Sequence, residues 1–113
     1  MQHRPIRIAV IASLLLLASC GIALPEDKAD YAGEWRSAEM SLRITRDGRV
    51  EYRRSRGKSS TTVEGPLQTF EGDEFSVGLS FMTTRFDVSV PPHEEDDHWY
   101  MTVDGVRLQR IAR

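Results

Sequence analysis

The sequence predicts an all-β protein: a small up-and-down antiparallel meander or barrel of about eight short strands that follows a helical signal peptide. Three observations support this prediction. From Tyr31 onward, apolar residues alternate with polar residues at a period of two, as they do in half-buried strands. Short turn sequences, most of which contain glycine, separate the alternating segments. No segment after Tyr31 has the 3.6-residue period of an amphipathic helix.

Residues 1–19 have the layout of a secretory signal. Arg4 and Arg7 give a positive start, and residues 8–18 carry no charge. A membrane-spanning helix needs roughly 20 apolar residues, and this run is shorter and ends in small residues. It is therefore typical of a helical signal peptide that is removed by cleavage.

The segment Leu17-Ala18-Ser19-Cys20 resembles the lipobox of bacterial lipoproteins, in which an apolar residue and two small residues precede a cysteine. The resemblance implies that diacylglycerol alkylates the Cys20 thiol, that the mature chain begins at Cys20, and that its new amino terminus is acylated. Two or three acyl chains hold a protein stably on a membrane, whereas one chain binds only marginally. The alternative is an ordinary signal peptide with a chance cysteine.

The residue after the cysteine bears on which membrane holds the chain. Lipoproteins that enteric bacteria retain in the inner membrane have aspartate at this position, and this chain has Gly21. The resemblance therefore implies that a lipid anchor attaches the chain to a cell membrane. The membrane expected is the outer membrane, with the domain facing the periplasm.

The mature chain divides into a tether and one domain. Residues 20–30 contain Pro25 and mixed charges without a period, which predicts a short lipidated tether. Residues 31–113 are enough for a single small β-barrel-like domain. Cys20 is the only cysteine, so a lipidated chain forms no internal disulfide, and its stability has to come from packing.

The strands are expected to form consecutive hairpins. Eight strands suffice to close a barrel, which removes the exposed edges of an open sheet; a curled open sheet is the alternative. The expected strands are residues 34–37, 41–45, 49–54, 61–70, 74–81, 84–90, 99–103 and 106–111.

Turn chemistry predicts the register of two hairpins. A three-residue loop closed by a left-handed Gly48 pairs Leu42 with Tyr52 and keeps apolar residues on one face. A two-residue Asp-Gly turn near the end of the chain pairs Met101 with Leu108.

Two further hairpins are expected from their aromatic residues. The turn at residues 71–74 sets Phe70 against Phe75, and a turn through residues 82–85 sets Phe81 against Phe86.

Gly33-Glu34-Trp35 is similar to the Gly-x-Trp of lipocalin-like (calycin) barrels. In that family the tryptophan closes one end of the barrel, and an arginine from the last strand stacks on it. The register of the last hairpin places Arg110 opposite Trp99, and the alternative is that Arg107 or Arg110 reaches Trp35; either pair would form a cation–π contact. The strands here are too short to enclose a deep cup, so a barrel of this size is expected to be filled by its own side chains.

Charge is distributed unevenly along the chain. Residues 40–60 contain seven arginine and lysine residues against two carboxylates, whereas residues 61–98 contain one arginine against nine carboxylates. The domain should therefore have a basic edge and an acidic edge. The cluster Arg53, Arg54, Arg56 and Lys58 is a candidate contact for anionic lipid headgroups or other envelope polyanions; a solvated loop is the alternative.

The segment 91–98 concentrates groups that can bind metals. His93, Glu94, Asp96 and His98 are the candidate ligands, but their spacing matches neither a zinc motif nor a calcium-binding loop. We predict a solvated acidic hairpin loop and no metal or other cofactor.

Catalysis is not expected. Both histidines of the mature chain lie in this one segment, and the one cysteine belongs to the lipobox. The sequence predicts a non-catalytic envelope lipoprotein whose β-domain contacts a protein or cell-wall partner, with no role for nucleic acid. The alternative is a calycin-like binder of a small apolar ligand; a packed interior favours the first function and an open apolar cavity the second.

Overall fold

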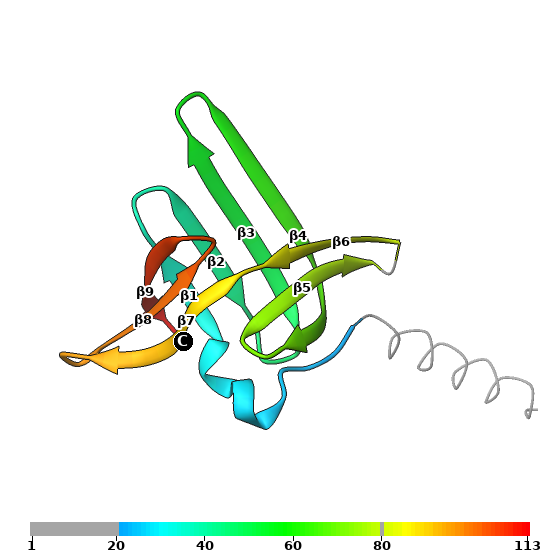
Figure 1. The fold of residues 1–113 in the computed structure, drawn as a ribbon, viewed down its shortest axis with the longest axis horizontal. Helices are drawn as coiled ribbons and strands as arrows, with labels where there is room; N and C mark the ends of the chain where they lie inside the picture. Colours follow the sequence, from blue (N-terminus) through cyan, green and yellow to red (C-terminus); the bar gives the residue numbers. More distant parts are fainter. Residues whose placement is uncertain (1–20, 80) are drawn as a thin grey trace, which may run out of the picture.

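The structure is a computed structural model that describes residues 21–79 and 81–113 (Figure 1). The predicted signal peptide and Cys20 lie outside the described residues. The described chain consists of one short 3₁₀ helix, η1 (Glu26–Tyr31), followed by strands. The strands are β1 (Gly33–Arg36), β2 (Met40–Ile44), β3 (Arg49–Arg56), β4 (Ser59–Glu71), β5 (Glu74–Leu79), β6 (Met82–Phe86), β7 (Val88–Glu95), β8 (His98–Val103) and β9 (Val106–Ala112).

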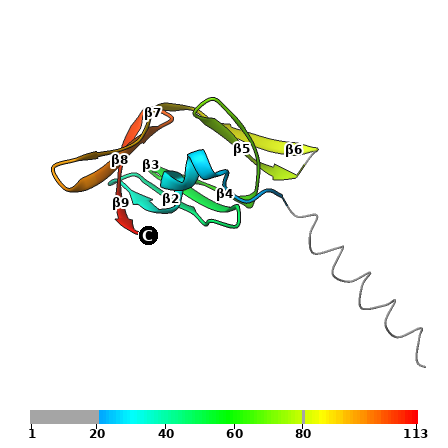
Figure 2. The ribbon, with the colours of Figure 1, turned by 90° about the horizontal axis from the view of Figure 1, so that it is seen from below.

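All nine strands belong to one antiparallel sheet with the order β6-β5-β4-β3-β2-β1-β9-β8-β7. Every neighbouring pair except β1–β9 is consecutive in the chain, so the predicted all-β, up-and-down meander is confirmed. The sheet curls into a half-barrel (Figures 1 and 2). Its two edge strands, β6 and β7, follow one another through the single residue Asp87.

Asp87 is also tied to the turn between β8 and β9. Its backbone N–H donates to the Asp104 carboxylate at 2.9 Å, and the Asp104 N–H donates to the Asp87 carbonyl oxygen at 2.8 Å. Asp87 interrupts the segment expected to be one strand over residues 84–90, which is why the structure has nine strands rather than about eight.

The concave side of the sheet is filled by its own side chains. Phe75 and Phe86 stack with ring centroids 5.2 Å apart, and Tyr52 lies 4.8 Å from Phe86. The buried apolar residues are Tyr31, Trp35, Met40, Leu42, Ile44, Val50, Tyr52, Leu67, Phe75, Val77, Phe86, Val88, Met101, Val103, Val106 and Leu108. This core holds the curled sheet together without a disulfide, because burying apolar area stabilises by roughly 25 cal/mol per Å².

Both registers predicted from turn chemistry are confirmed. Leu42 pairs with Tyr52 across β2–β3, and Met101 pairs with Leu108 across β8–β9. Gly48 has φ +90°, as the left-handed position of the β2–β3 loop requires, and a Cβ there would also collide with the Ile22 carbonyl.

The two aromatic hairpins have different outcomes. Phe70 pairs with Phe75 as predicted, but the expected pairing of Phe81 with Phe86 is wrong. Phe86 pairs with Phe75, and the turn falls earlier, between Leu79 and its register partner Met82. This register places Phe86 in the core and leaves Phe81 exposed.

The acidic segment 91–98 is a hairpin of two strands rather than a loop. β7 continues to Glu95, and the turn consists of Asp96 and Asp97, both with positive φ. Register shifts between Val88 and His93 accommodate Pro91-Pro92, because proline has no N–H to donate and is tolerated at bulges of edge strands.

Residues 21–31, which the composition assigns mainly to a tether, contact the sheet. The Ile22 N–H donates to the Leu67 carbonyl oxygen and the Leu24 N–H to that of Arg46, each at 3.0 Å. The η1 helix lies across one end of the half-barrel (Figure 2). Its last residue, Tyr31, is buried and donates from its hydroxyl to the Asp73 carbonyl oxygen at 2.9 Å. Burial, together with the nearby Asp73 carboxylate, raises the pKa of the Tyr31 phenol.

Candidate functional site

Three hairpins project from the half-barrel in different directions, and they differ in charge (Figure 1). The β3–β4 hairpin carries the basic cluster, the β7–β8 hairpin carries the acidic segment, and the β5–β6 hairpin has no charged residue between Phe75 and Thr84. The predicted basic and acidic edges therefore lie on separate projections of one sheet.

The basic hairpin carries three exposed cations. Arg53, Arg56 and Lys58 are exposed and form no salt bridge with any described residue. The partner strand opposite them supplies only hydroxyl side chains: Thr62 pairs with Arg53, and Ser59 pairs with Arg56. The positive charge of these three residues is therefore not offset by a salt bridge within the described part of the chain.

Arg54 is less exposed than the other three cations of the cluster. It follows Val50 and Tyr52 on the inward-facing side of β3, and its side chain is only 15 % exposed. Its Nη2 lies 3.4 Å from a Glu39 carboxylate oxygen, and its buried Nε has no hydrogen-bond partner. The structure thus places Arg54 in a contact between the β1–β2 turn and the hairpin, which the linear cluster did not indicate.

A shallow groove lies at the base of the basic hairpin, on the outer face of β1–β4. It encloses about 250 Å³ and is lined by Glu34, Arg36, Arg43, Glu51, Arg53 and Glu64 among others. Arg43 lies 3.9 Å from both Glu34 and Glu51. Because opposite charges alternate here, the groove suits polar groups and does not extend the basic surface.

The acidic hairpin places its imidazoles in local hydrogen bonds. His93 Nε2 lies 2.6 Å from a Glu95 carboxylate oxygen, which also lies 3.3 Å from Arg107. The hydrogen bond to Glu95, followed by that to the Pro91 carbonyl, raises the pKa of His93.

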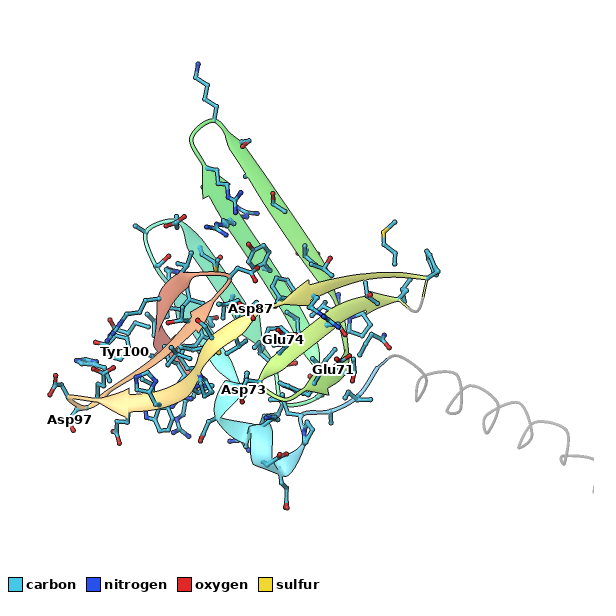
Figure 3. All side chains as sticks on the ribbon, viewed as in Figure 1. Glu71, Asp73, Glu74, Asp87, Asp97 and Tyr100 are labelled. Atoms are coloured by element: carbon cyan, nitrogen blue, oxygen red, sulfur yellow. The ribbon has the colours of Figure 1, made fainter. Side chains whose placement is uncertain are left out.

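The remaining candidate ligands of this hairpin do not converge with His93. His98 lies 3.2 Å from the Gln109 amide, and Asp97 is at the tip of the hairpin (Figure 3). Within residues 21–79 and 81–113, no three His, Asp or Glu side chains are grouped to hold a metal ion, and Glu94 and Asp96 join no such set.

The predicted tryptophan–arginine contacts bring both tryptophans to one arginine. The Arg110 guanidinium lies 5.4 Å from the Trp35 ring centroid and 4.7 Å from that of Trp99. It also donates to the Asp30 and Ala32 carbonyl oxygens at 3.2 and 3.4 Å. Arg110 therefore connects β9 to the segment around η1.

Two further contacts surround this arrangement. Trp35 donates from Nε1 to the Tyr31 carbonyl oxygen at 3.0 Å, which fixes its indole beneath η1. Arg107 does not reach Trp35: its guanidinium lies 4.0 Å from the Tyr100 ring centroid.

A hollow of about 520 Å³ lies beside Arg110, where η1 meets the ends of β2 and β9. Its lining includes Ala29, Ile44, Arg46, Arg110 and Arg113. It is outside the packed core and has both apolar and charged walls.

Comparisons with known proteins do not assign a family. No family model matches the chain, and neither a curated protein nor a solved structure matches it significantly. In the part of the chain that the structure describes, no helix has the length and apolar character needed to cross a membrane.

The sequence alone does not predict two features of these surfaces. Glu39 engages Arg54, which the alternation along β3 could have indicated, since Arg54 shares a face with Tyr52. The β5–β6 hairpin exposes Leu79, Phe81 and Met82, although period-two alternation placed the first two inside.

Proposed function

We propose that this chain is a non-catalytic, membrane-anchored envelope lipoprotein whose β-domain contacts an anionic protein or cell-wall partner through the β3–β4 hairpin. One observation supports this function above the others: Arg53, Arg56 and Lys58 are exposed on this hairpin and form no salt bridge among the described residues. Unpaired cations on a projection raise the local concentration of anions and speed association.

The filled interior supports a role at the surface. Trp35, Phe75 and Phe86 each have a relative exposure of 1 %, so the aromatic core has no room for a ligand unless these rings move. An apolar ligand in the concave face would have to displace side chains that pack in contact.

The lipobox and the start of the described chain support anchoring. Cys20 immediately precedes Gly21, and Ile22 is hydrogen-bonded to β4, so lipid on Cys20 would hold the domain close to the bilayer. Gly21 in place of aspartate supports the outer membrane, with the domain in the periplasm. A fatty-acid analogue should label the wild-type chain in cells, and Cys20→Ala should abolish the label; a label that persists would contradict the anchor.

The non-catalytic part of the proposal is consistent with the histidines. His93 contacts Glu95 and Pro91, and His98 contacts Gln109, so neither imidazole is placed to activate a described serine or threonine hydroxyl.

The basic hairpin is tested by charge removal with a matched control. In the acylated full chain, Arg53→Gln, Arg56→Gln and Lys58→Gln together should abolish or strongly reduce in-cell crosslinking to the partner. The control removes three exposed cations elsewhere, by Arg46→Gln, Arg49→Gln and Arg113→Gln. Equal loss in both triple variants would mean that net charge alone matters, and no loss in the first would refute the hairpin as the contact.

A calycin-like function in binding a small apolar ligand is the second candidate. It is favoured by one specific arrangement: Trp35 lies beneath η1 with Arg110 beside it, next to the hollow of about 520 Å³. A dansyl-labelled fatty acid tests it. Saturable one-to-one binding to the full chain would favour this function, and fluorescence that rises without saturation would oppose it.

A further inference from the structure

The β5–β6 hairpin exposes apolar side chains at its tip. Phe81 is 81 % exposed, Met82 73 % and Leu79 53 %. Single exposed apolar residues are ordinary on protein surfaces, but three on one narrow hairpin form an apolar projection. Something other than water is expected to cover them.

The surroundings of this tip are uncharged. Residues 21–25, 65–70 and 75–84 contain no Asp, Glu, Lys or Arg, although such residues make up 28 % of the chain. The three segments are also neighbours in space, because Ile22 is hydrogen-bonded to Leu67, Leu67 pairs with Val77, and Val77 pairs with Thr84. The three segments therefore form one contiguous uncharged stretch from the start of the described chain to β6. Charged residues border this stretch: Arg46 and Arg49 on one side, and Arg85 with its partners Glu71 and Glu74 on the other.

The described chain begins next to this hairpin. A Cβ on Gly21 would lie 2.6 Å from the Pro66 Cβ, so Gly21 packs on β4 at the level where β5 passes toward its tip. Strands rise about 3.3 Å per residue, so Leu79 lies roughly 7 Å beyond Val77 along β5. The start of the described chain and the apolar tip thus lie on the same side of the domain.

The charged projections point elsewhere. The tip of the acidic β7–β8 hairpin lies at the opposite end of the half-barrel from the β5–β6 tip in both views (Figures 1 and 2), and Asp97 marks its end (Figure 3). An acidic projection is repelled by anionic headgroups. The uncharged apolar tip and the acidic tip therefore lie at opposite ends of the half-barrel.

We propose that Leu79, Phe81 and Met82 insert into the bilayer that holds the lipid anchor, as a second contact that orients the domain. This inference rests on the anchor in the proposed function. With two contacts on one side, the β7–β8 hairpin points away from the membrane and the β3–β4 hairpin stays accessible to a partner.

The size of the apolar tip favours a bilayer over a protein. A stable protein interface buries about 800 Å² on each partner, whereas three side chains of about 150–200 Å² each supply at most roughly 600 Å². A bilayer needs no complementary surface, and an uncharged hairpin enters it without dehydrating an ionised group.

The test uses the acylated full chain in vesicles of phosphatidylethanolamine and phosphatidylglycerol. Phe81→Cys receives an environment-sensitive NBD probe, and Ser60→Cys on the β3–β4 hairpin receives the same probe as the matched control. The probe at residue 81 should emit at shorter wavelength and be quenched by nitroxide-bearing lipid. The probe at residue 60 should emit as it does in water and be quenched by aqueous iodide.

Two outcomes would overturn the inference alone. A probe at residue 81 that behaves like the probe at residue 60 would show that the tip stays in water. A blue shift at residue 81 that disappears when the protein is diluted in the membrane would show that a second copy covers the tip.

The intact mass of the same samples separates this inference from the anchor. A Cys20 that carries lipid cannot react with the probe, so each variant then takes up one label. An unacylated Cys20 would refute the anchor and the inference together, whereas an acylated Cys20 with a water-exposed probe at residue 81 would refute only the inference.

Discussion

Replacing Arg110 by alanine should destabilise the domain by about 2–4 kcal/mol. Arg110 lies over two tryptophan rings, at 5.4 and 4.7 Å from their centroids, and each such contact contributes about 0.5–1 kcal/mol. It also donates to the Asp30 and Ala32 carbonyls at 3.2 and 3.4 Å. Hydrogen bonds to charged groups contribute about 1.5–3 kcal/mol each. The two Arg110 bonds are long and partly solvated, so each is assigned less than about 1.5 kcal/mol.

Arg107→Ala is the matched control on the same strand. Arg107 has one aromatic contact, with Tyr100 at 4.0 Å, and an exposed ion pair with Glu95, so its loss should cost about 1 kcal/mol. Urea unfolding followed by far-ultraviolet circular dichroism measures both variants without relying on tryptophan emission, which the substitutions themselves change. Equal losses in the two variants, or a loss below about 0.5 kcal/mol for Arg110→Ala, would refute the reasoning.

Three further predictions follow from the core, the acidic hairpin and one turn. Phe86→Ala should cost about 3–5 kcal/mol because the ring is fully packed, whereas Phe81→Ala should leave the free energy of unfolding nearly unchanged, and denaturation curves compare them. Proton NMR should show His93 titrating above its ordinary pKa of 6.5, and Glu95→Gln should return it toward that value; no change would contradict the hydrogen bond as the cause. The pKa of His93 is raised and that of Glu95 is lowered in the folded protein. The stabilisation from this pair is therefore lost as pH rises through the pKa of His93, and also as pH falls through the pKa of Glu95. Gly48→Ala should lower the melting temperature because φ is +90° and the new Cβ meets the Ile22 carbonyl, and an unchanged melting temperature would contradict this geometry.

The parts of the fold that could be predicted are those in which turn chemistry and alternation agree. The left-handed Gly48 permits only one loop length that keeps Leu42 and Tyr52 on the same face, and the structure has that register. The same argument, continued two residues along β3, separates Arg53 outside from Arg54 inside. The linear cluster concealed this difference because neighbours in a strand point to opposite faces.

The β5–β6 hairpin could not be predicted in this way. Its turn lacks proline and a glycine at the tip, so local sequence does not distinguish one register from another. The register is decided by tertiary packing, because Phe86 stacks on Phe75 at 5.2 Å only when the turn falls between Leu79 and Met82. Alternation alone therefore predicts that Phe81 points into the core, whereas in the structure Phe86 is buried and Phe81 is exposed.

The acidic segment was misjudged for a related reason. Pro91-Pro92 is typical of a loop, but β7 is an edge strand, where the missing N–H groups need no partner, and register shifts absorb the distortion.

The convergence of Arg110 on Trp35 and Trp99 also depends on β1 pairing with β9, a contact between the two ends of the domain.

The central claim is that a lipid-anchored domain acts through its surface, with the basic hairpin as the contact. In-cell photocrosslinking from residue 60 of the acylated chain, which pairs with Ser55 on the basic hairpin, is the decisive experiment. We expect a discrete adduct with an envelope protein or cell-wall polymer that disappears when Arg53, Arg56 and Lys58 become glutamine. An adduct that persists in that variant, or none in the wild-type chain, would contradict it.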